Sequence, residues 1–197
     1  MTTPFYSYDN RQGVLPISWE DFFSLCKGLA LAVASYQPEI ILGIARGGLY
    51  PATLLSHLLQ AELYPIRLTS RFQDRVVYDE PQWLVKPPPI ISNRRILIVD
   101  EICGKGRTLR MATQEVENLG ATAIKTAVMY AHSPGQDVPD YIGIISDALI
   151  LNPWDREIVR DGEFVFHPEY VLALEKQGMQ PTPSLLLGIG PARLAKG

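Results

Sequence analysis

The feature that most constrains this chain is the stretch Arg95–Thr108, where a continuous apolar run leads into two acids and a glycine loop. Ile96–Val99 are all apolar, a pattern typical of a strand buried on both faces of a parallel sheet. Asp100 and Glu101 follow, and the small-residue loop Cys103–Gly106 then leads into a predicted helix. The stretch therefore indicates a strand–loop–helix unit of an α/β protein.

This unit combines two kinds of ligand group. Acids at the carboxyl end of a buried strand lie where α/β sheets bind ligands, and a glycine loop before a helix offers backbone N–H groups to an anion. The combination of these acids with an anion-binding loop suits a sugar phosphate. The P-loop spacing is missing, and the dinucleotide fingerprint would need a third glycine where Leu109 stands.

A second unit of the same kind lies upstream. The apolar run Ile40–Ile44 predicts a strand, Arg46-Gly47-Gly48 follows it, and a helix is expected over Leu49–Leu59 with Pro51 near its first turn. Glycines at this point let the backbone approach a charged ligand closely. Two strand–loop–helix units suited to phosphate are stronger evidence for a phosphorylated ligand than either unit alone.

The two units resemble those of the type I phosphoribosyltransferases, closest to the small bacterial and archaeal xanthine-guanine or hypoxanthine-guanine (purine) enzymes. Asp100, Glu101, Gly106 and Thr108 match that family's signature for phosphoribosyl diphosphate (PRPP). The resemblance runs over about residues 17–159 and includes the VPDY run at 138–141 and Pro-Trp-Asp at 153–155. It implies an α/β fold, a parallel sheet flanked by helices with a small hood.

The resemblance also implies roles. Asp100 and Glu101 would act in catalysis by binding the ribose hydroxyls, with or without Mg²⁺ between, and are the expected metal ligands. The 5-phosphate would be held by Cys103, Gly104, Lys105, Gly106, Arg107 and Thr108. Pyrophosphate would meet Arg46, Gly47 and Arg71, and the family often has a cis peptide at the position of Ala45–Arg46. Lys105 and Arg107 could equally be solvated side chains, and a surface arginine is the other interpretation of Arg71.

The expected base site departs from the family. His132 stands where a lysine usually reads the purine 6-oxo group, and Leu149 where an aromatic ring usually stacks on the base; Ile150 completes the predicted base-binding set. An ordinary loop histidine is the other interpretation of His132, and Trp154 is expected to pack in the core of its lobe. Gly104 replaces the aspartate credited with proton transfer, and glycine cannot do acid–base work.

The resemblance implies an enzyme of purine salvage. It would transfer ribose 5-phosphate from PRPP to a nitrogenous base, for which a 6-oxopurine is expected, and release pyrophosphate. The alternative is a catalytically weak or inactive PRPP-binding regulatory protein, because Gly104, His132 and Leu149 all depart from the enzymes' pattern. The partners expected are PRPP, a small base and a second copy of the chain in a homo-oligomer.

The rest of the chain predicts alternating elements. A helix begins at a variant capping box of Ser18 with Asp21 and runs to about Tyr36. Further strands are predicted at 63–68, 124–130 and 142–145, and further helices at 107–119 and 168–178. Gln73–Asn93 is predicted to be irregular, and a structureless stretch of this length suggests a mobile functional loop. In the family this position carries the lid over PRPP.

Composition limits the remaining possibilities. With 197 residues, 47% of them hydrophobic, the chain is expected to form an N-terminal extension (1–16), one phosphoribosyltransferase domain with its hood (17–180) and a C-terminal tail (181–197). The tail's apolar patch at 185–187 is expected to dock on a partner subunit or to be disordered. A net charge of −3 without a basic cluster argues against nucleic acid, and no apolar stretch reaches the roughly 18 residues of a membrane span.

The two cysteines, Cys26 and Cys103, make no disulfide framework, and the N-terminus lacks the pattern of a secretory signal, so a cytoplasmic protein is expected. Cys103 has two interpretations. Its place at a helix N-terminus beside Lys105 would lower the thiol pKa and make it reactive, whereas phosphate loops also favour small residues simply to save space.

Overall fold

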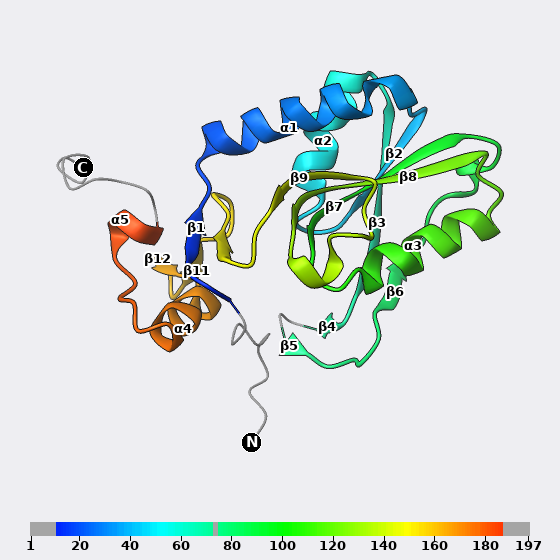
Figure 1. The fold of residues 1–197 in the computed structure, drawn as a ribbon. Coiled ribbons are helices and arrows are strands. Elements are labelled where there is room, and N and C mark those ends of the chain that lie inside the picture. The colour runs from blue at the N-terminus through cyan, green and yellow to red at the C-terminus, as the bar shows by residue number, and fades with distance from the viewer. Residues whose placement is uncertain (1–10, 73–74, 187–197) are drawn as a thin grey trace. The chain divides into compact units, whose positions relative to one another are not determined.

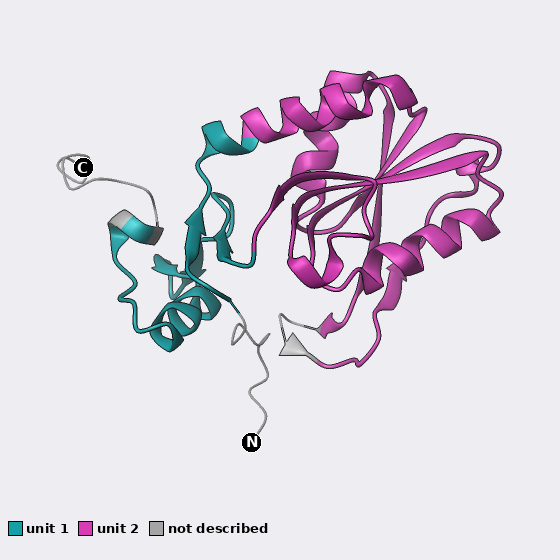
Figure 2. Ribbon diagram, viewed as in Figure 1, with its two compact units in different colours: residues 1–22, 147–197 teal, residues 23–146 magenta. Residues whose placement is uncertain are grey.

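The computed structural model describes residues 11–72 and 75–186 and divides the chain into two compact units. One unit comprises residues 23–146, and the other comprises residues 1–22 with 147–197 (Figure 2). Within the described ranges, no helix combines the length and the apolar character that crossing a bilayer requires.

The larger unit is built on a six-stranded sheet with the strand order β6-β3-β2-β7-β8-β9 (Figure 1). Its strands are β2 (Ile40–Ile44), β3 (Glu62–Thr69), β6 (Gln82–Val85), β7 (Arg95–Cys103), β8 (Ala123–Ala131) and β9 (Tyr141–Ile145). All neighbours pair in parallel except β3 and β6. Central strands β2 and β7 are wholly apolar where they pair, because helices cover both faces of the sheet.

The expectation that Gln73–Asn93 lacks structure is wrong in part. This stretch contains β6, strand β5 (Arg75–Val76), which pairs with β4 (Arg71–Phe72), and a 3₁₀ turn at Pro89–Ile91. The parallel sheet therefore has one antiparallel edge. Trp83 of β6 packs against the core, whereas Leu84 and Val85 are both exposed. This strand is therefore too short to show a clear alternation of buried apolar and exposed polar residues.

Three helices flank the sheet: α1 (Trp19–Val33), α2 (Leu49–Leu59) and α3 (Arg107–Asn118). The predicted capping box is confirmed, since Ser18 Oγ accepts from the Asp21 backbone N–H at 3.0 Å and Asp21 Oδ2 accepts from the Ser18 N–H at 2.9 Å. Helix α2 packs closely on β2, where a Cβ at Gly43 would lie 2.8 Å from that of Ala52. Helix α3 lies on the opposite face (Figure 1), and Gly120, with φ of +80°, follows its C-terminal end, as predicted.

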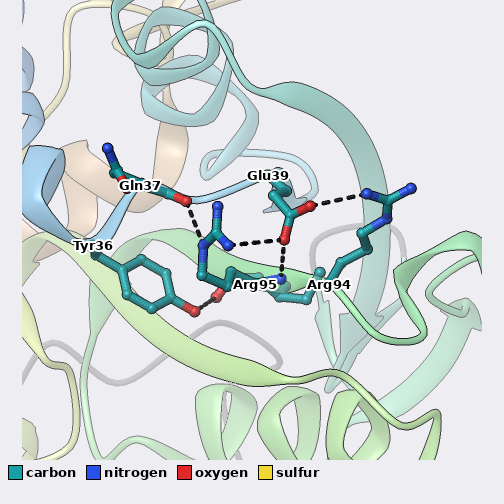
Figure 3. A network of polar contacts seen from close by, with 6 residues as sticks. Tyr36, Gln37, Glu39, Arg94 and Arg95 are labelled. Carbon is teal, nitrogen blue, oxygen red and sulfur yellow. Dashed lines mark hydrogen bonds and ion pairs between the residues drawn. The ribbon is translucent and has the colours of Figure 1, made fainter.

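Polar contacts tie the amino ends of β2 and β7 together (Figure 3). Glu39 accepts hydrogen bonds from the side chain of Arg94 at 2.9 Å and from the backbone N–H of Arg95 at 3.0 Å. Arg95 also donates to the carbonyl of Gln37 at 2.8 Å, and the Tyr36 hydroxyl donates to the Ile96 carbonyl at 2.9 Å. These hydrogen bonds thus join the residues that precede β2 to the beginning of β7.

The described part of the smaller unit contains two short sheets and the helices α4 and α5. Strand β1 (Val14–Pro16) pairs in parallel with β10 (Leu149–Leu151), and β11 (Glu157–Arg160) pairs with β12 (Glu163–Phe166). Helices α4 (Pro168–Lys176) and α5 (Pro183–Leu186) follow, the first of them as predicted. Residues 14–16 of the expected N-terminal extension therefore belong to a sheet, and positions 1–10 and 187–197 of the two expected terminal segments lie outside the described residues.

A small core holds this unit together. It is formed by Leu149, Leu151, Tyr170, Ala173 and Leu174. Arg156 is 6% exposed and donates to three backbone carbonyls, those of Ile17, Leu151 and Asn152. Trp154 packs edge-on against Phe22 with ring centroids 5.0 Å apart, which confirms its expected place in the packing of this lobe.

Candidate active site

The predicted site residues of the larger unit gather at the carboxyl ends of its parallel strands. Strand β7 extends through both acids to Cys103, so Asp100 and Glu101 are the last polar residues of a paired strand rather than part of the loop. Asp100 Oδ1 accepts a hydrogen bond from the backbone N–H of Glu101 at 2.8 Å. Burial raises the pKa of Asp100 to about 7, although that hydrogen bond opposes the shift. A bound cation or diol would stabilise its charged form.

The Arg46-Gly47-Gly48 loop at the end of β2 lies directly against these acids. A Cβ at Gly47 would stand 1.5 Å from Glu101 Oε2, and a Cβ at Gly48 would stand 2.9 Å from the Asp100 Cα. Both glycines are therefore required by close approach of β7. The Ala45–Arg46 peptide is cis, as the resemblance implied, and the Arg46 side chain is exposed.

The loop after β7 ends in an N-terminus of α3 that carries no side-chain cap. Gly106 is the N-cap residue with φ of +76°, and no side chain of the described residues accepts from the first helical N–H groups at this cap. Uncapped N–H groups together with the helix dipole favour an anion. Thr108 lies in this first turn and is half-buried, and Lys105 is exposed. This loop and the uncapped helix N-terminus together have the geometry expected of a phosphate-binding site, here called the phosphate cradle.

A second loop, residues 132–138 after β8, supports this cradle from one side. The His132 backbone N–H donates to the Cys103 carbonyl at 2.9 Å, and a Cβ at Gly135 would stand 2.7 Å from the Gly104 carbonyl oxygen. Val138 fills the space beside Gly106, since a Cβ there would lie 2.6 Å from Val138 Cγ2. Sequence reasoning missed Gly135 and Val138, because only the register of β7 with β8 brings the loops together.

Cys103 is a packing residue of this arrangement. It is 2% exposed, and its thiol donates to the Gly135 carbonyl at 3.3 Å. Burial, reinforced by the nearby charge of Asp100, raises the pKa of the Cys103 thiol to about 11. The interpretation of Cys103 as a low-pKa, reactive thiol is therefore wrong, and the space-filling interpretation is the one that the structure supports.

One predicted phosphate ligand is engaged with the segment before β6, and another lies in β4. Arg107 donates to the Asp79 carbonyl at 2.8 Å and to Glu80 Oε1 at 3.2 Å, so its guanidinium holds that segment. Arg71 lies in β4, where its N–H donates to Thr69 Oγ1 at 3.0 Å. The predicted lid segment is thus hydrogen-bonded, through Asp79 and Glu80, to Arg107, the first residue of α3.

The predicted base-site residues fall in different units. His132 belongs to the larger unit, is 4% exposed, and has its ring Nδ1 2.6 Å from the Ser146 carbonyl oxygen. Leu149 and Ile150 lie in β10 of the smaller unit, where both are buried and Leu149 is part of the core. His132 is therefore described within the larger unit, and Leu149 and Ile150 are described within the smaller one.

The donor set at Asp100 and Glu101 fits a magnesium ion better than a softer metal. Both side chains offer carboxylate oxygens, which Mg²⁺ prefers, and Mg²⁺ commonly takes only one or two carboxylates plus waters and substrate phosphates. No group of three or more His, Cys, Asp or Glu suited to a metal occurs among residues 11–72 and 75–186. The acids thus suit a metal that arrives with a phosphate ligand rather than a resident one.

The opposite end of the sheet offers no comparable chemistry. A hollow of about 520 Å³ there is lined by Ala34, Gln37, Pro38, Leu58, Leu59 and Arg95. Of the described residues that line it, Arg95 alone is charged, and its guanidinium contacts Gln37 and Glu39. The candidate site is therefore the carboxyl end of β2 and β7.

Comparison with known proteins agrees with this geometry. The model of the phosphoribosyl transferase domain matches residues 18–160, well over half of the chain. The chain belongs to the phosphoribosyltransferase family. Among its relatives, the xanthine-guanine phosphoribosyltransferase of Nitratidesulfovibrio vulgaris is 28% identical over 177 residues, covering 87% of this chain and 97% of that protein. The corresponding enzyme of Idiomarina loihiensis is 23% identical over 145 residues, covering 72% and 87%.

Solved structures of other phosphoribosyltransferases share the fold. The purine phosphoribosyltransferase of Pyrococcus horikoshii superposes with a TM-score of 0.66 at 29% identity, covering 76% of this chain and 99% of that one. The xanthine-guanine-hypoxanthine phosphoribosyltransferase of Helicobacter pylori gives a TM-score of 0.61 at 19% identity, covering 73% and 93%. The predicted fold class, an α/β protein with a mostly parallel sheet flanked by helices, is confirmed.

Proposed function

We propose that this phosphoribosyltransferase transfers ribose 5-phosphate from PRPP to a 6-oxopurine and releases pyrophosphate, a reaction of purine salvage. The observation that carries the proposal is the apposition of two glycine loops at neighbouring strands, with the Glu101 carboxylate against Gly47. PRPP carries a phosphate at one end and a diphosphate at the other, so it needs two anion sites on either side of a diol site. The loops after β2 and β7, with the acids between them, would provide that order of sites.

Each part of PRPP would have its own residues. The N-terminus of α3, with Gly106 and Thr108, would hold the 5-phosphate, assisted by Lys105 and Arg107. Asp100 and Glu101 would accept from the ribose hydroxyls, and Mg²⁺ bound to them would neutralise part of the diphosphate charge. Arg46, Gly47 and Arg71 would face pyrophosphate as it leaves, and His132 would line the base site from the larger unit. The sequence predicts base contacts for Leu149 and Ile150 as well, and these two lie in the smaller unit. Cys103 and Gly104 would shape the phosphate loop.

The chemistry would depend on leaving-group stabilisation more than on proton transfer. The base nitrogen would form a bond to C1 of ribose as the bond from C1 to the diphosphate oxygen breaks, and the proton released from the base would pass to water. Arg46 would stabilise the charge of the leaving diphosphate, and Mg²⁺ held by Asp100 and Glu101 would supply further positive charge there. Gly104 provides no acid or base at the position where the family has aspartate. General acid–base help is worth roughly 10²- to 10⁴-fold, so its loss slows such a reaction without abolishing it.

The alternative function is a regulatory protein that binds PRPP without turnover, and the observation that favours it is the same glycine at position 104. We also propose a homo-oligomer, and a cytoplasmic location, which the two buried cysteines without a disulfide would suit. The two functions differ in their products, since only the enzyme would form nucleotide and pyrophosphate.

Incubation of the pure protein with PRPP, Mg²⁺ and a panel of bases tests the proposal. Hypoxanthine, guanine and xanthine should each be compared with adenine and a pyrimidine base, with nucleotide and pyrophosphate both measured. Equimolar nucleotide and pyrophosphate with a 6-oxopurine are expected. Saturable PRPP binding with no nucleotide from any base would reject the enzyme and leave the regulatory alternative.

The variant Gly104→Asp sharpens that test. For an enzyme weakened by loss of its acid–base group, the restored carboxylate should raise turnover by about 10²-fold. PRPP affinity must be measured in the same variant, because the new charge lies near the expected 5-phosphate site. Brisk wild-type turnover that Gly104→Asp fails to raise would show that the proton is handled elsewhere.

A further inference from the structure

The phosphate cradle contains little that could hold its own backbone in one conformation. Gly106, the N-cap residue of α3, has no side chain with which to cap the helix, and its φ of +76° is one that glycine alone adopts easily. Arg110 donates to the Lys105 carbonyl at 2.9 Å and steadies one peptide of the loop from within α3. The conformation of the glycines themselves therefore depends on groups that pack against them.

Those groups come from the loop after β8, residues 132–138. Gly135 approaches the cradle so closely that a Cβ there would stand 2.7 Å from the Gly104 carbonyl oxygen. Val138 packs against Gly106, since a Cβ at that glycine would lie 2.6–2.9 Å from Cβ, Cγ1 and Cγ2 of the valine. Both contacts act on the backbone of the cradle, which is the part that directs its N–H groups.

This supporting loop is itself anchored to the sheet. The Val138 N–H donates to the Gly135 carbonyl at 3.2 Å, and the Val138 side chain packs against the core of the larger unit. Two residues further on, the Asp140 N–H donates to Thr126 Oγ1 at 3.0 Å, and the Asp140 carboxylate accepts from the Thr126 N–H at 2.8 Å. Strand β8 thus fixes the position of Val138, and Val138 fixes that of Gly106.

We propose that Val138 and Gly135 are positioning residues that set the affinity of the phosphate cradle for a sugar phosphate. The inference rests on the proposed function, in which the cradle binds the 5-phosphate of PRPP. A site that is already ordered loses less conformational freedom on binding, so loosening its support lowers affinity although every ligand group remains. Because such coupling is reciprocal, a phosphate in the cradle should in turn stabilise the loop after β8.

Calorimetric titration of wild type, Val138→Ala and Val138→Ile tests the role of the valine. Alanine removes both γ carbons that lie against Gly106, whereas isoleucine keeps them. We expect Val138→Ala to bind PRPP with Mg²⁺ about fivefold or more weakly and Val138→Ile to bind like wild type. Pyrophosphate with Mg²⁺, which the proposed function assigns to the loop after β2, should bind both variants within about twofold of wild type.

Val116→Ala is the matched control. Val116 is fully buried in the same core and lies toward the other end of α3, so this variant makes the same deletion far from the cradle. Its melting temperature should fall at least as far as that of Val138→Ala, while its PRPP affinity stays at the wild-type value. An equal loss of PRPP affinity in the two variants would overturn the proposal, because Val138 would then act only through stability.

Gly135→Ala approaches the cradle from its other side. The backbone of Gly135 lies outside the left-handed region, so the added methyl group acts through its contact with the Gly104 carbonyl rather than through backbone strain. This variant should also lose PRPP affinity by about fivefold or more. Unchanged affinity in both Val138→Ala and Gly135→Ala would overturn the inference and leave the transferase function intact.

Hydrogen exchange in wild type tests the reciprocal effect without any substitution. The amides of Gly135 and Val138 donate within the loop, at 2.8 Å to the His132 carbonyl and at 3.2 Å to the Gly135 carbonyl. Saturation with PRPP and Mg²⁺ should slow their exchange by about fivefold or more, and exchange that PRPP leaves unchanged would overturn the inference. Wild type that does not bind PRPP at all would overturn the proposed function and this inference together.

Discussion

The carboxylate of Glu101 occupies the space where a side chain at Gly47 would begin, 1.5 Å from the position of a Cβ at that glycine. Glu101 follows the apolar run of β7 and Gly47 follows that of β2, and the parallel register of the two strands brings them together. An acid proposed to bind the ribose diol and a loop proposed to bind the diphosphate are thus adjacent. The contact gives the first prediction.

Gly47→Ala and Gly48→Ala should fail in different ways. A methyl group at position 47 meets the movable end of the Glu101 side chain, so this variant should fold but bind PRPP with Mg²⁺ about tenfold or more weakly. A methyl group at position 48 meets backbone atoms of Ile44 and Asp100 at 2.6 and 2.9 Å, and should cost about 1–3 kcal/mol of stability. Thermal unfolding and calorimetry, run on both variants, separate the two effects. Equal loss of stability in both would argue against a movable Glu101.

Glu80→Gln tests whether Arg107 is shared between the segment before β6 and a phosphate. The Arg107–Glu80 pair is exposed, so its loss should leave the melting temperature nearly unchanged. If Arg107 serves the 5-phosphate, removing its competing carboxylate should raise PRPP affinity by up to about fivefold, the upper range of an exposed ion pair. Glu115→Gln, which breaks the Lys86–Glu115 pair at 2.8 Å, is the matched control and should have no effect. Identical affinities for both variants would place Arg107 outside the phosphate site.

Much of this fold could be predicted because its central elements are locally encoded. The runs Ile40–Ile44 and Ile96–Val99 are apolar on both faces, and α2 spans the residues predicted for it. The edge strand β6 and the pairing of β1 with β10 were missed, since short strands take their identity from a distant partner rather than from a pattern of their own. The candidate site likewise has residues that the local sequence identifies and contacts that depend on the pairing of distant strands.

Motif residues such as Asp100 and Thr108 could be identified from sequence, because spacing along one strand and loop fixes them. The contacts of Gly135 with Gly104, and of His132 with Ser146, depend on the register between β7, β8 and β9. Of the two interpretations that the sequence left open for Cys103, the low-pKa one was wrong for the same reason. The sequence shows a helix N-terminus beside it, and the burial that outweighs that effect comes from the loop after β8.

The Asp140 carboxylate should stabilise the fold in a pH-dependent way. It accepts from the Thr126 backbone N–H at 2.8 Å and pairs with Lys125 at 2.6 Å. Burial raises the pKa of Asp140, but the hydrogen bonds from Lys125 and Thr126 outweigh it, and the net pKa is lowered. The stabilisation is therefore present above the unfolded pKa of about 3.9 and is lost as pH falls through the lower folded value.

Asp140→Asn should accordingly lower the unfolding free energy by about 1–3 kcal/mol at pH 7, and the difference from wild type should shrink below about pH 4. Chemical denaturation across pH 3–8 measures it, with the exposed Asp137→Asn as control. A difference that persists undiminished into acid would mean that the charge of Asp140 is not what stabilises the fold.

Neither cysteine should react readily in the folded protein. Burial raises the pKa of Cys26 to about 12 and that of Cys103 to about 11, so the thiolate fraction at neutral pH is very small. A chromogenic disulfide reagent should label both only after denaturation, with or without PRPP. Rapid native labelling of Cys103 that PRPP prevents would contradict the packing role assigned to it.

Titration of PRPP with Mg²⁺ into wild type and Asp100→Ala, followed by calorimetry, tests the central claim most directly. The carboxyl end of β7 is the expected ribose and metal site, so wild type should show saturable binding, and Asp100→Ala should weaken it at least about tenfold while retaining a cooperative thermal transition. Asp137→Asn should bind like wild type. No saturable binding to wild type, or equal affinity in Asp100→Ala, would contradict the account.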